Sequence, residues 1–134
     1  MPLESLRPGL VGEASTIVRV GNTANEVVPG AVSMFSTPSM VGLMEHASWN
    51  AIAGHLADGE TSVGTVVDIK HLAASPIGLN VTAHAEVVEV DGRRVRFRVE
   101  AKDSSEVIGE GFHERFIVDL DRFLIRANQK SGQS

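Results

Sequence analysis

Residues 37–56 read TPSMVGLMEHASWNAIAGHL, and this stretch decides the fold. It is the one long helical candidate in the chain, because its apolar residues recur at helical spacing and cover more than one narrow stripe. These residues are Met40, Val41, Leu43, Met44, Ala47, Ala51, Ile52 and Leu56. Thr37 followed by Pro38 is typical of a helix N-cap and a first helical position, and Asp58-Gly59 closes the segment. The pattern predicts a helix from 40 to 56 that other elements enclose.

Most of the remaining chain is strand-like. The expected strands are residues 13–20, 61–72, 79–90, 94–102 and 106–118. The pair Asp91-Gly92 favours a tight hairpin turn between the third and fourth of them. In the last strand Ile108, Phe112, Phe116 and Val118 share one parity, which predicts that they face the helix. Residues 119–128 are expected to form a short amphipathic helix, followed by a frayed tail at 129–134.

One enclosed helix and long antiparallel strands predict the α+β class, with the sheet curled around the helix. We expect one domain spanning residues 1–134, since neither a repeat nor a low-complexity linker divides the chain. The element order fits a hot-dog fold, an antiparallel sheet wrapped around one long central helix. Such a sheet leaves an open edge, and pairing with a second copy is the usual remedy.

Composition narrows the function classes. The chain has 134 residues, no cysteine and a formal net charge of −5. Disulfides, thiolate metal sites and a cysteine nucleophile are therefore excluded, and the charge argues against binding to a phosphate backbone. The first eight residues do not resemble a signal peptide, and no window is apolar for long enough to cross a bilayer. We expect a cytoplasmic protein.

Glu45 is the most informative position. It is the only residue with a formal charge between Val27 and Ala57, and it lies in the middle of the apolar helix. Burying a carboxylate costs several kcal/mol, roughly, unless it is paired or protonated. The functional interpretation is a catalytic carboxylate. The structural alternative is that Glu45 reaches solvent along a partly exposed face or caps a buried donor.

Two further polar residues accompany Glu45. His71 shares the parity of Val67 and Ile69 in its strand, so it is expected to face the helix. A lone inward histidine is more often a satisfied core residue, but beside a carboxylate it forms an acid/base pair suited to neutral pH. Thr37 is explained by capping alone, yet its hydroxyl would also lie at a helix N-terminus, where amides stabilise a developing oxyanion.

Four stretches, in order, resemble the fluoroacetyl-CoA thioesterase family of hot-dog enzymes. They are Thr37-Pro-Ser-Met-Val-Gly-Leu-Met-Glu45, Ser62-Val-Gly-Thr-Val66, His71-Leu-Ala-Ala-Ser-Pro-Ile-Gly-Leu79 and Gly111-Phe-His-Glu-Arg115. The likeness runs from about Phe35 to the terminal helix. It implies a catalytic set of Thr37, Glu45 and His71 at a homodimer interface.

The resemblance also implies substrate-binding roles for Gly64, near the acyl group, and for Arg115. By simple alternation Arg115 would face away from the helix, unless a bulge near Gly109 or Gly111 reverses the parity. Before Thr37 the likeness is weaker. The family's lid bears phenylalanines, whereas residues 28–35 of this chain offer only Phe35, which is therefore the substrate-binding candidate in this segment. The resemblance therefore predicts the reaction class, hydrolysis of an acyl-CoA thioester, and does not predict which acyl group is the substrate.

The expected function is hydrolysis of a short acyl-CoA thioester to free acid and CoA. No cofactor is expected, since coenzyme A enters as part of the substrate, and the histidines show no ligand-like spacing for a metal. The alternative is a non-catalytic acyl-CoA or small-ligand binding module on the same dimer. Arg94, Arg96 and Arg98 alternate with apolar residues, as on a solvated sheet face, so neither nucleic acid nor a membrane is an expected partner.

Overall fold

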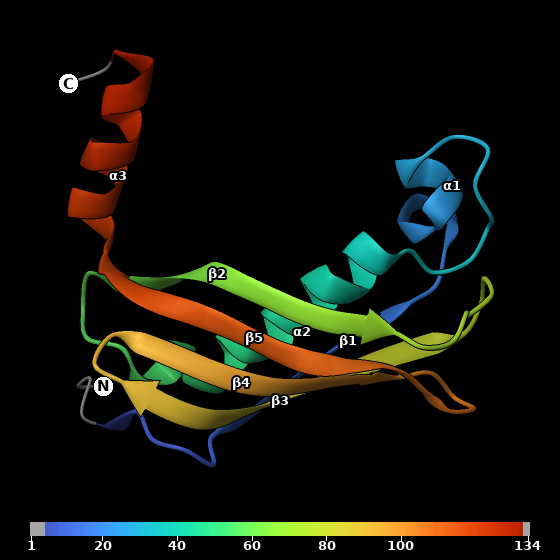
Figure 1. Cartoon of the computed structure of the whole chain (residues 1–134), viewed down its shortest axis with the longest axis horizontal. Coiled ribbons are helices and arrows are strands. Elements are labelled where there is room, and N and C mark those ends of the chain that lie inside the picture. The colour runs from blue at the N-terminus through green and yellow to red at the C-terminus, as the bar shows by residue number, and fades with distance from the viewer. Residues whose placement is uncertain (1–4, 133–134) are drawn as a thin grey trace.

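The computed structural model describes residues 5–132, which form one antiparallel sheet curled around a long helix (Figure 1). The strands are β1 (Val11–Ile17), β2 (Glu60–His71), β3 (Asn80–Asp91), β4 (Arg94–Lys102) and β5 (Val107–Asp119). Their order in the sheet is β1-β3-β4-β5-β2, so β1 and β2 are the edges. The long helix is α2 (Thr37–Ile52). The predicted α+β class and the wrapped helix are confirmed.

Helix α2 begins one residue earlier than its sequence suggests. Its N-cap is Ser36, whose Oγ accepts a hydrogen bond of 3.1 Å from the backbone N–H of Ser39. Thr37 is thus the first helical residue, and its hydroxyl is not used for capping. Seven residues of α2 are buried: Met40, Leu43, Met44, Ala47, Ser48, Ala51 and Ile52. The helix ends at Ile52 and a single 3₁₀ turn, Ala53–His55, completes the segment.

The core lies between α2 and the inner face of the sheet. On β4, Val95, Phe97, Val99 and Ala101 are fully buried, which confirms the alternation expected for this strand. The outward arginines pair with carboxylates: Glu114 accepts from Arg94 at 3.1 Å and from Arg96 at 2.7 Å. The outer face is therefore an ion-paired surface, as the sequence predicted.

Strand β5 contains a bulge that reverses its parity. Ala101 of β4 lies opposite Gly109, whereas Lys102 lies opposite Val107, so Ile108 is an extra residue without a partner on β4. Ile108 and Gly109 are consecutive and both buried. The inward residues that follow are His113, Arg115 and Ile117. The prediction that Phe112 and Phe116 face the helix was wrong, and Phe116 is 41% exposed.

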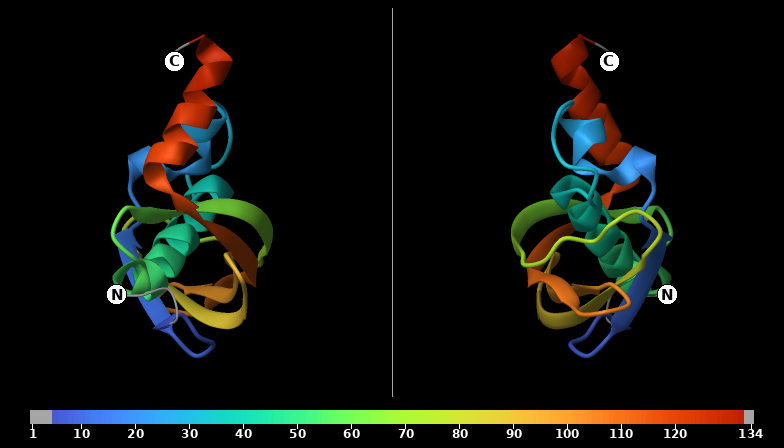
Figure 2. Two further views of the ribbon diagram at one scale, coloured as in Figure 1. Left: turned by 90° about the vertical axis from the view of Figure 1, so that its left-hand side faces the viewer. Right: turned by 90° about the vertical axis from the view of Figure 1, so that its right-hand side faces the viewer.

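Two small helices lie outside the wrapped core. They are α1 (Ala24–Val27), in the segment before α2, and α3 (Leu120–Asn128), which follows β5. Both project beyond the β2 edge, at opposite ends of that strand (Figures 1 and 2). The expected frayed tail instead continues as a 3₁₀ turn, Gln129–Ser131. Residues 133–134 of that tail, and residues 1–4 of the N-terminal segment, lie outside the described residues.

None of the helices within residues 5–132 is both long enough and apolar enough to span a bilayer.

Candidate active site

Thr37 and His71 meet at the N-terminus of α2. Thr37 stands in the first turn of the helix, and His71 is the last residue of β2. The Thr37 Oγ1 and His71 Nδ1 atoms share a hydrogen bond of 2.8 Å. The pair lies on a pocket of about 350 Å³, which Val32, Met34 and Leu72 also line. A hydroxyl, an imidazole and the first backbone N–H of a helix therefore lie at one pocket.

The imidazole of His71 is held in its neutral form. Burial lowers the pKa of His71 below 6.5, and the Ala73 backbone only partly opposes this effect. Within the described residues, the buried Nε2 atom of His71 has no hydrogen-bond partner. An unsatisfied buried nitrogen costs about 1–3 kcal/mol, which makes it a candidate for a functional atom. A neutral imidazole can accept a proton near neutral pH.

Glu45 belongs to a second polar group, in the middle of α2. Its Oε2 lies 3.5 Å from the Nη1 atom of Arg115, whose side chain is only 8% exposed, whereas that of Glu45 is 40% exposed. Arg115 also donates from Nε to Ser62 Oγ at 2.8 Å and from Nη2 to the Ser62 carbonyl at 3.0 Å. Burial lowers the pKa of Arg115, and Glu45 opposes the shift. The structural alternative for Glu45 is therefore observed, since its carboxylate is paired with a buried donor and still reaches the surface, and its catalytic role stays a prediction.

His113 completes this second group, although no sequence pattern singled it out. Its ring is fully buried and stacks on Phe97. The Nδ1 atom lies 2.8 Å from the Val66 carbonyl, which can only accept, so Nδ1 carries the proton. The Nε2 atom is then free to accept from Arg115 Nη1 at 3.3 Å. Burial lowers the pKa of His113, and the adjacent Arg115 adds to the shift, which keeps the ring neutral.

The bulge in β5 decides where these side chains lie. Without the extra residue Ile108, both His113 and Arg115 would point outward. A second register shift, between Gly64 and Val66 of β2, lies beside the Val66 carbonyl that His113 binds. The sequence signal for this arrangement was the pair of glycines at 109 and 111, which is compatible with a bulge but does not fix its position.

Gly64 and Phe35 occupy different surroundings. A Cβ at Gly64 would lie 2.7 Å from Glu45 Oε2 and 3.2 Å from the His113 ring, so the absence of a side chain leaves the carboxylate open. Phe35 lines the pocket of Thr37 and His71, but it is only 2% exposed and belongs to the core. Gly64 is therefore grouped with Glu45, and Phe35 is grouped with Thr37.

One subunit alone does not unite the three expected catalytic residues. Among the described residues, no hydrogen bond or ion pair joins Glu45 to Thr37 or His71. At a helical rise of 1.5 Å per residue, Thr37 and Glu45 are separated by about 12 Å along α2. The structure thus forms a Thr37–His71 pair and a separate Glu45–Arg115–His113 group.

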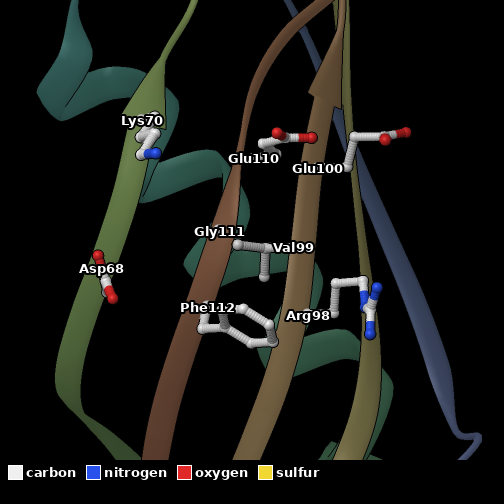
Figure 3. Close-up of a pocket in the computed structure, with 8 residues that line it drawn as sticks. All are labelled: Asp68, Lys70, Arg98, Val99, Glu100, Glu110, Gly111 and Phe112. Carbon is white, nitrogen blue, oxygen red and sulfur yellow. The ribbon is translucent and has the colours of Figure 1, made fainter.

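A larger pocket, of about 480 Å³, lies on the outer face of the sheet. Figure 3 shows that its side chains come from three adjacent strands, with Asp68 and Lys70 on β2, Glu110 and Phe112 on β5, and Arg98 on β4. Charges of both signs are mixed there, and the sheet separates it from α2. This pocket has no concentration of one charge, and neither Thr37 nor Glu45 lines it. Within residues 5–132 no three histidine or carboxylate side chains gather as metal ligands.

The comparison with known proteins decides the family. The model of the family described as fluoroacetyl-CoA-specific thioesterase matches residues 18–121. The chain belongs to this family. The fluoroacetyl-CoA thioesterase of Streptantibioticus cattleyicolor is 46% identical over 98 residues, which cover 73% of this chain and 70% of that protein.

Solved structures agree with this family assignment. A structure of the fluoroacetyl-CoA thioesterase matches with a TM-score of 0.88 at 38% identity, covering 93% of this chain and 97% of that one. A variant of that enzyme in complex with acetyl-CoA matches with a TM-score of 0.86 at 37% identity, covering 93% and 98% of the two chains. A hot-dog-like protein from Thermanaerovibrio acidaminovorans has a TM-score of 0.88 at 25% identity, covering 98% and 97%. The hot-dog fold and the class of enzyme, a thioester hydrolase, are confirmed.

Proposed function

We propose that this protein hydrolyses a short-chain acyl-CoA thioester to the free acid and CoA. The observation that carries the proposal is the 2.8 Å contact between Thr37 Oγ1 and His71 Nδ1 at the α2 N-terminus. Because Ser36 provides the cap, the Thr37 hydroxyl can donate to a thioester carbonyl when His71 Nδ1–H donates to Thr37 Oγ1. The pocket of about 350 Å³ beside this pair is within the size range of small-molecule sites.

Each residue has a distinct role in this mechanism. The hydroxyl and backbone N–H of Thr37 orient the carbonyl and stabilise its oxyanion as the thioester is attacked. Glu45 either removes a proton from the attacking water or attacks the carbonyl itself to give a transient anhydride, which water then hydrolyses. In both routes His71 accepts the proton that the water loses and passes it to the thiolate of CoA, so that CoA leaves as a free thiol. No metal or cofactor takes part, and CoA enters only as part of the substrate.

The separation of about 12 Å along α2 supports a homodimer, because Glu45 and Thr37 of one helix are too far apart to touch the same carbonyl. We propose that Glu45 of one subunit and the Thr37–His71 pair of the other face one thioester. The β2 edge is the surface for this pairing. Strand β2 is twelve residues long, and it exposes the apolar side chains of Val66 and Val67. A long apolar edge strand is unfavourable in water and favours pairing with another chain. The cytoplasm is the proposed compartment.

A screen of acyl-CoA substrates of different chain length, with release of free thiol as the readout, tests the activity. Short acyl chains should be hydrolysed fastest, and no thiol release from any of them would refute the proposal. Glu45→Gln should lose turnover by about 10²–10⁴-fold while still binding acyl-CoA, since acid/base groups contribute this much. If Glu45→Gln binds and turns over as the wild type does, the protein is a binding module instead.

Rapid quench in ¹⁸O-labelled water under single-turnover conditions separates the two routes of attack. Label in the Glu45 carboxylate supports the anhydride, and label only in the released acid supports direct attack by water.

A further inference from the structure

Helix α3 presents an apolar face that the other described residues cover only in part. Leu120, Phe123 and Leu124 follow the i, i+3, i+4 spacing of one helix face, and no residue of α3 is buried in the subunit. The helix stands away from the sheet in all three views (Figures 1 and 2). A nine-residue helix is marginal in water by itself, so its stability calls for packing of this face.

The anchor of α3 fixes its position relative to the pocket. The Leu120 N–H donates to the Gly59 carbonyl at 2.9 Å, so α3 begins beside the residue that precedes β2. The Thr37–His71 pair lies at the other end of the same strand, where β2 terminates at His71. Within one subunit, therefore, α3 and this pocket are separated by the length of β2.

A second copy brings the two together. Two identical edge strands that pair about a twofold axis run antiparallel, so the start of one β2 lies beside the end of the other. Helix α3 of one subunit then stands next to α1 and the Thr37–His71 pocket of its partner. This arrangement rests on the dimer proposed above.

The surface around the pocket fits α3 in polarity. Its apolar residues are exposed in the subunit: Val27, Val28, Val32 and Leu72. The only formal charge between residues 20 and 44 is that of Glu26, which is negative. Helix α3 and the turn after it carry Arg122, Arg126 and Lys130 against one carboxylate, Asp121. Arg126 lies one turn from Phe123, so it flanks the apolar face where it can meet Glu26.

We propose that α3 of each subunit packs over the Thr37–His71 pocket of the other and forms one wall of it. Phe123 then supplies an apolar aromatic surface to the acyl group. Within the subunit, the aromatic residue of the pocket, Phe35, offers little surface to an acyl group because it is almost wholly buried in the core. Each acyl site is thereby completed by the partner, and α3 restricts the length of chain that enters.

Cross-linking tests this placement directly, because the chain contains no cysteine of its own. The full-length double variant Val32→Cys/Phe123→Cys should form a disulfide-linked dimer on mild oxidation. Both positions are exposed, and the segment that joins α1 to α2 lies at the opposite end of the subunit from α3 (Figure 1), so the bond must join two chains. The matched control pairs Phe123→Cys with Ile17→Cys, which is exposed on the β1 edge. The two single variants control for bonds between identical positions.

Light scattering and thiol release by the same variants separate the outcomes. A dimer that cross-links no better than the control pair overturns the placement of α3, while the proposed hydrolysis stands if thiol is still released. A monomer overturns both the dimer and this inference. As a second measurement, Phe123→Ala should raise KM for the preferred short acyl-CoA about tenfold. An unchanged profile across acyl chain lengths would show that Phe123 forms no part of the pocket.

Discussion

At the residue scale, Ser36 and Thr37 divide two tasks at the start of α2. Ser36 caps the helix, and Thr37 bonds His71. Thr37→Val should therefore lower kcat by about 10²-fold, as loss of an oxyanion donor does. Its free energy of unfolding should change by less than about 0.5 kcal/mol, because the residue is exposed. Ser36→Ala should do the reverse, losing about 1 kcal/mol of stability with kcat nearly unchanged.

Urea unfolding and thiol-release kinetics on both variants measure the two effects separately. Equal losses of kcat and stability in Thr37→Val would return Thr37 to a structural role.

His113 allows a similar separation. Its Nδ1–H donates to the Val66 carbonyl, and its Nε2 accepts from Arg115. Asparagine and glutamine can each reproduce one of these two hydrogen bonds. His113→Asn keeps a donor near the Nδ1 position, and His113→Gln places an acceptor near the Nε2 position. Both lose the stacking on Phe97 and should be destabilised alike. Only His113→Asn should release Arg115 from its orientation toward Glu45, lowering kcat about tenfold further than His113→Gln, or about 1.4 kcal/mol.

The pH dependence of kcat for the two His113 variants is the measurement. Identical profiles and equal rates would mean that His113 only fills space.

The residues that the sequence revealed are those whose chemistry conflicts with their surroundings. Glu45 was visible because a charge in an apolar helix requires a partner, yet the sequence could not name Arg115 as that partner. Thr37 and His71 were visible by position and parity, and the structure joins them. Ser62 and His113 gave no signal, since their importance comes from contacts across strands that local pattern does not encode. The catalytic roles of Thr37, Glu45 and His71 stay predictions until the variants are measured.

At the element scale, periodicity located every strand and both of the expected helices within a few residues. It failed on β5, because one inserted residue exchanges the two faces of a strand and a bulge has no fixed sequence signature. The N-cap was misplaced by one residue for a comparable reason, as Ser36 and Thr37 are equally good caps by type. Pattern thus fixes the elements, and local irregularities decide which side chains face the site.

Close packing of α2 on β1 depends on a glycine. A Cβ at Gly12 would overlap the Ala47 carbonyl oxygen and the Ala51 backbone nitrogen. Gly12→Ala should therefore lower the free energy of unfolding by about 1–3 kcal/mol or more, since overpacking a rigid backbone contact forces the helix outward. Gly42, on an exposed face of α2, has nothing within 4 Å of its virtual Cβ. Gly42→Ala should stabilise the helix by roughly 0.5–1 kcal/mol.

Urea denaturation of the two glycine variants checks this contrast. A neutral Gly12→Ala would show that the helix can move away from β1 at little cost.

At the scale of the whole molecule, the buried His113 and the half-buried His71 couple stability to pH. Burial lowers the pKa values of both His71 and His113 in the folded state. Below pH 6.5 the unfolded chain therefore binds more protons than the folded one, and folding is opposed. The stabilisation is fully present above pH 6.5 and is lost as the pH falls through the folded pKa values. The free energy of unfolding should decrease between pH 7 and pH 5.5, and His113→Gln should flatten the decrease.

Urea midpoints across that range provide the measurement. Stability that rises on acidification would contradict the buried, neutral state of the two rings.

The proposed dimer can be tested at the edges of the sheet, which are β1 and β2 among the described strands. Val67 on β2 and Ile17 on β1 are exposed to similar extents, 51% and 56%. In the isolated subunit, replacing either residue by glutamate should therefore cost little folding free energy. A carboxylate buried at a subunit interface, however, costs several kcal/mol, roughly. Val67→Glu should therefore shift the protein to monomers in light scattering and abolish thiol release, since both halves of the site are then separated. Ile17→Glu should stay dimeric and active. A monomeric Ile17→Glu protein would instead place the interface at β1, and Glu45 would then not face the Thr37 and His71 of a partner subunit.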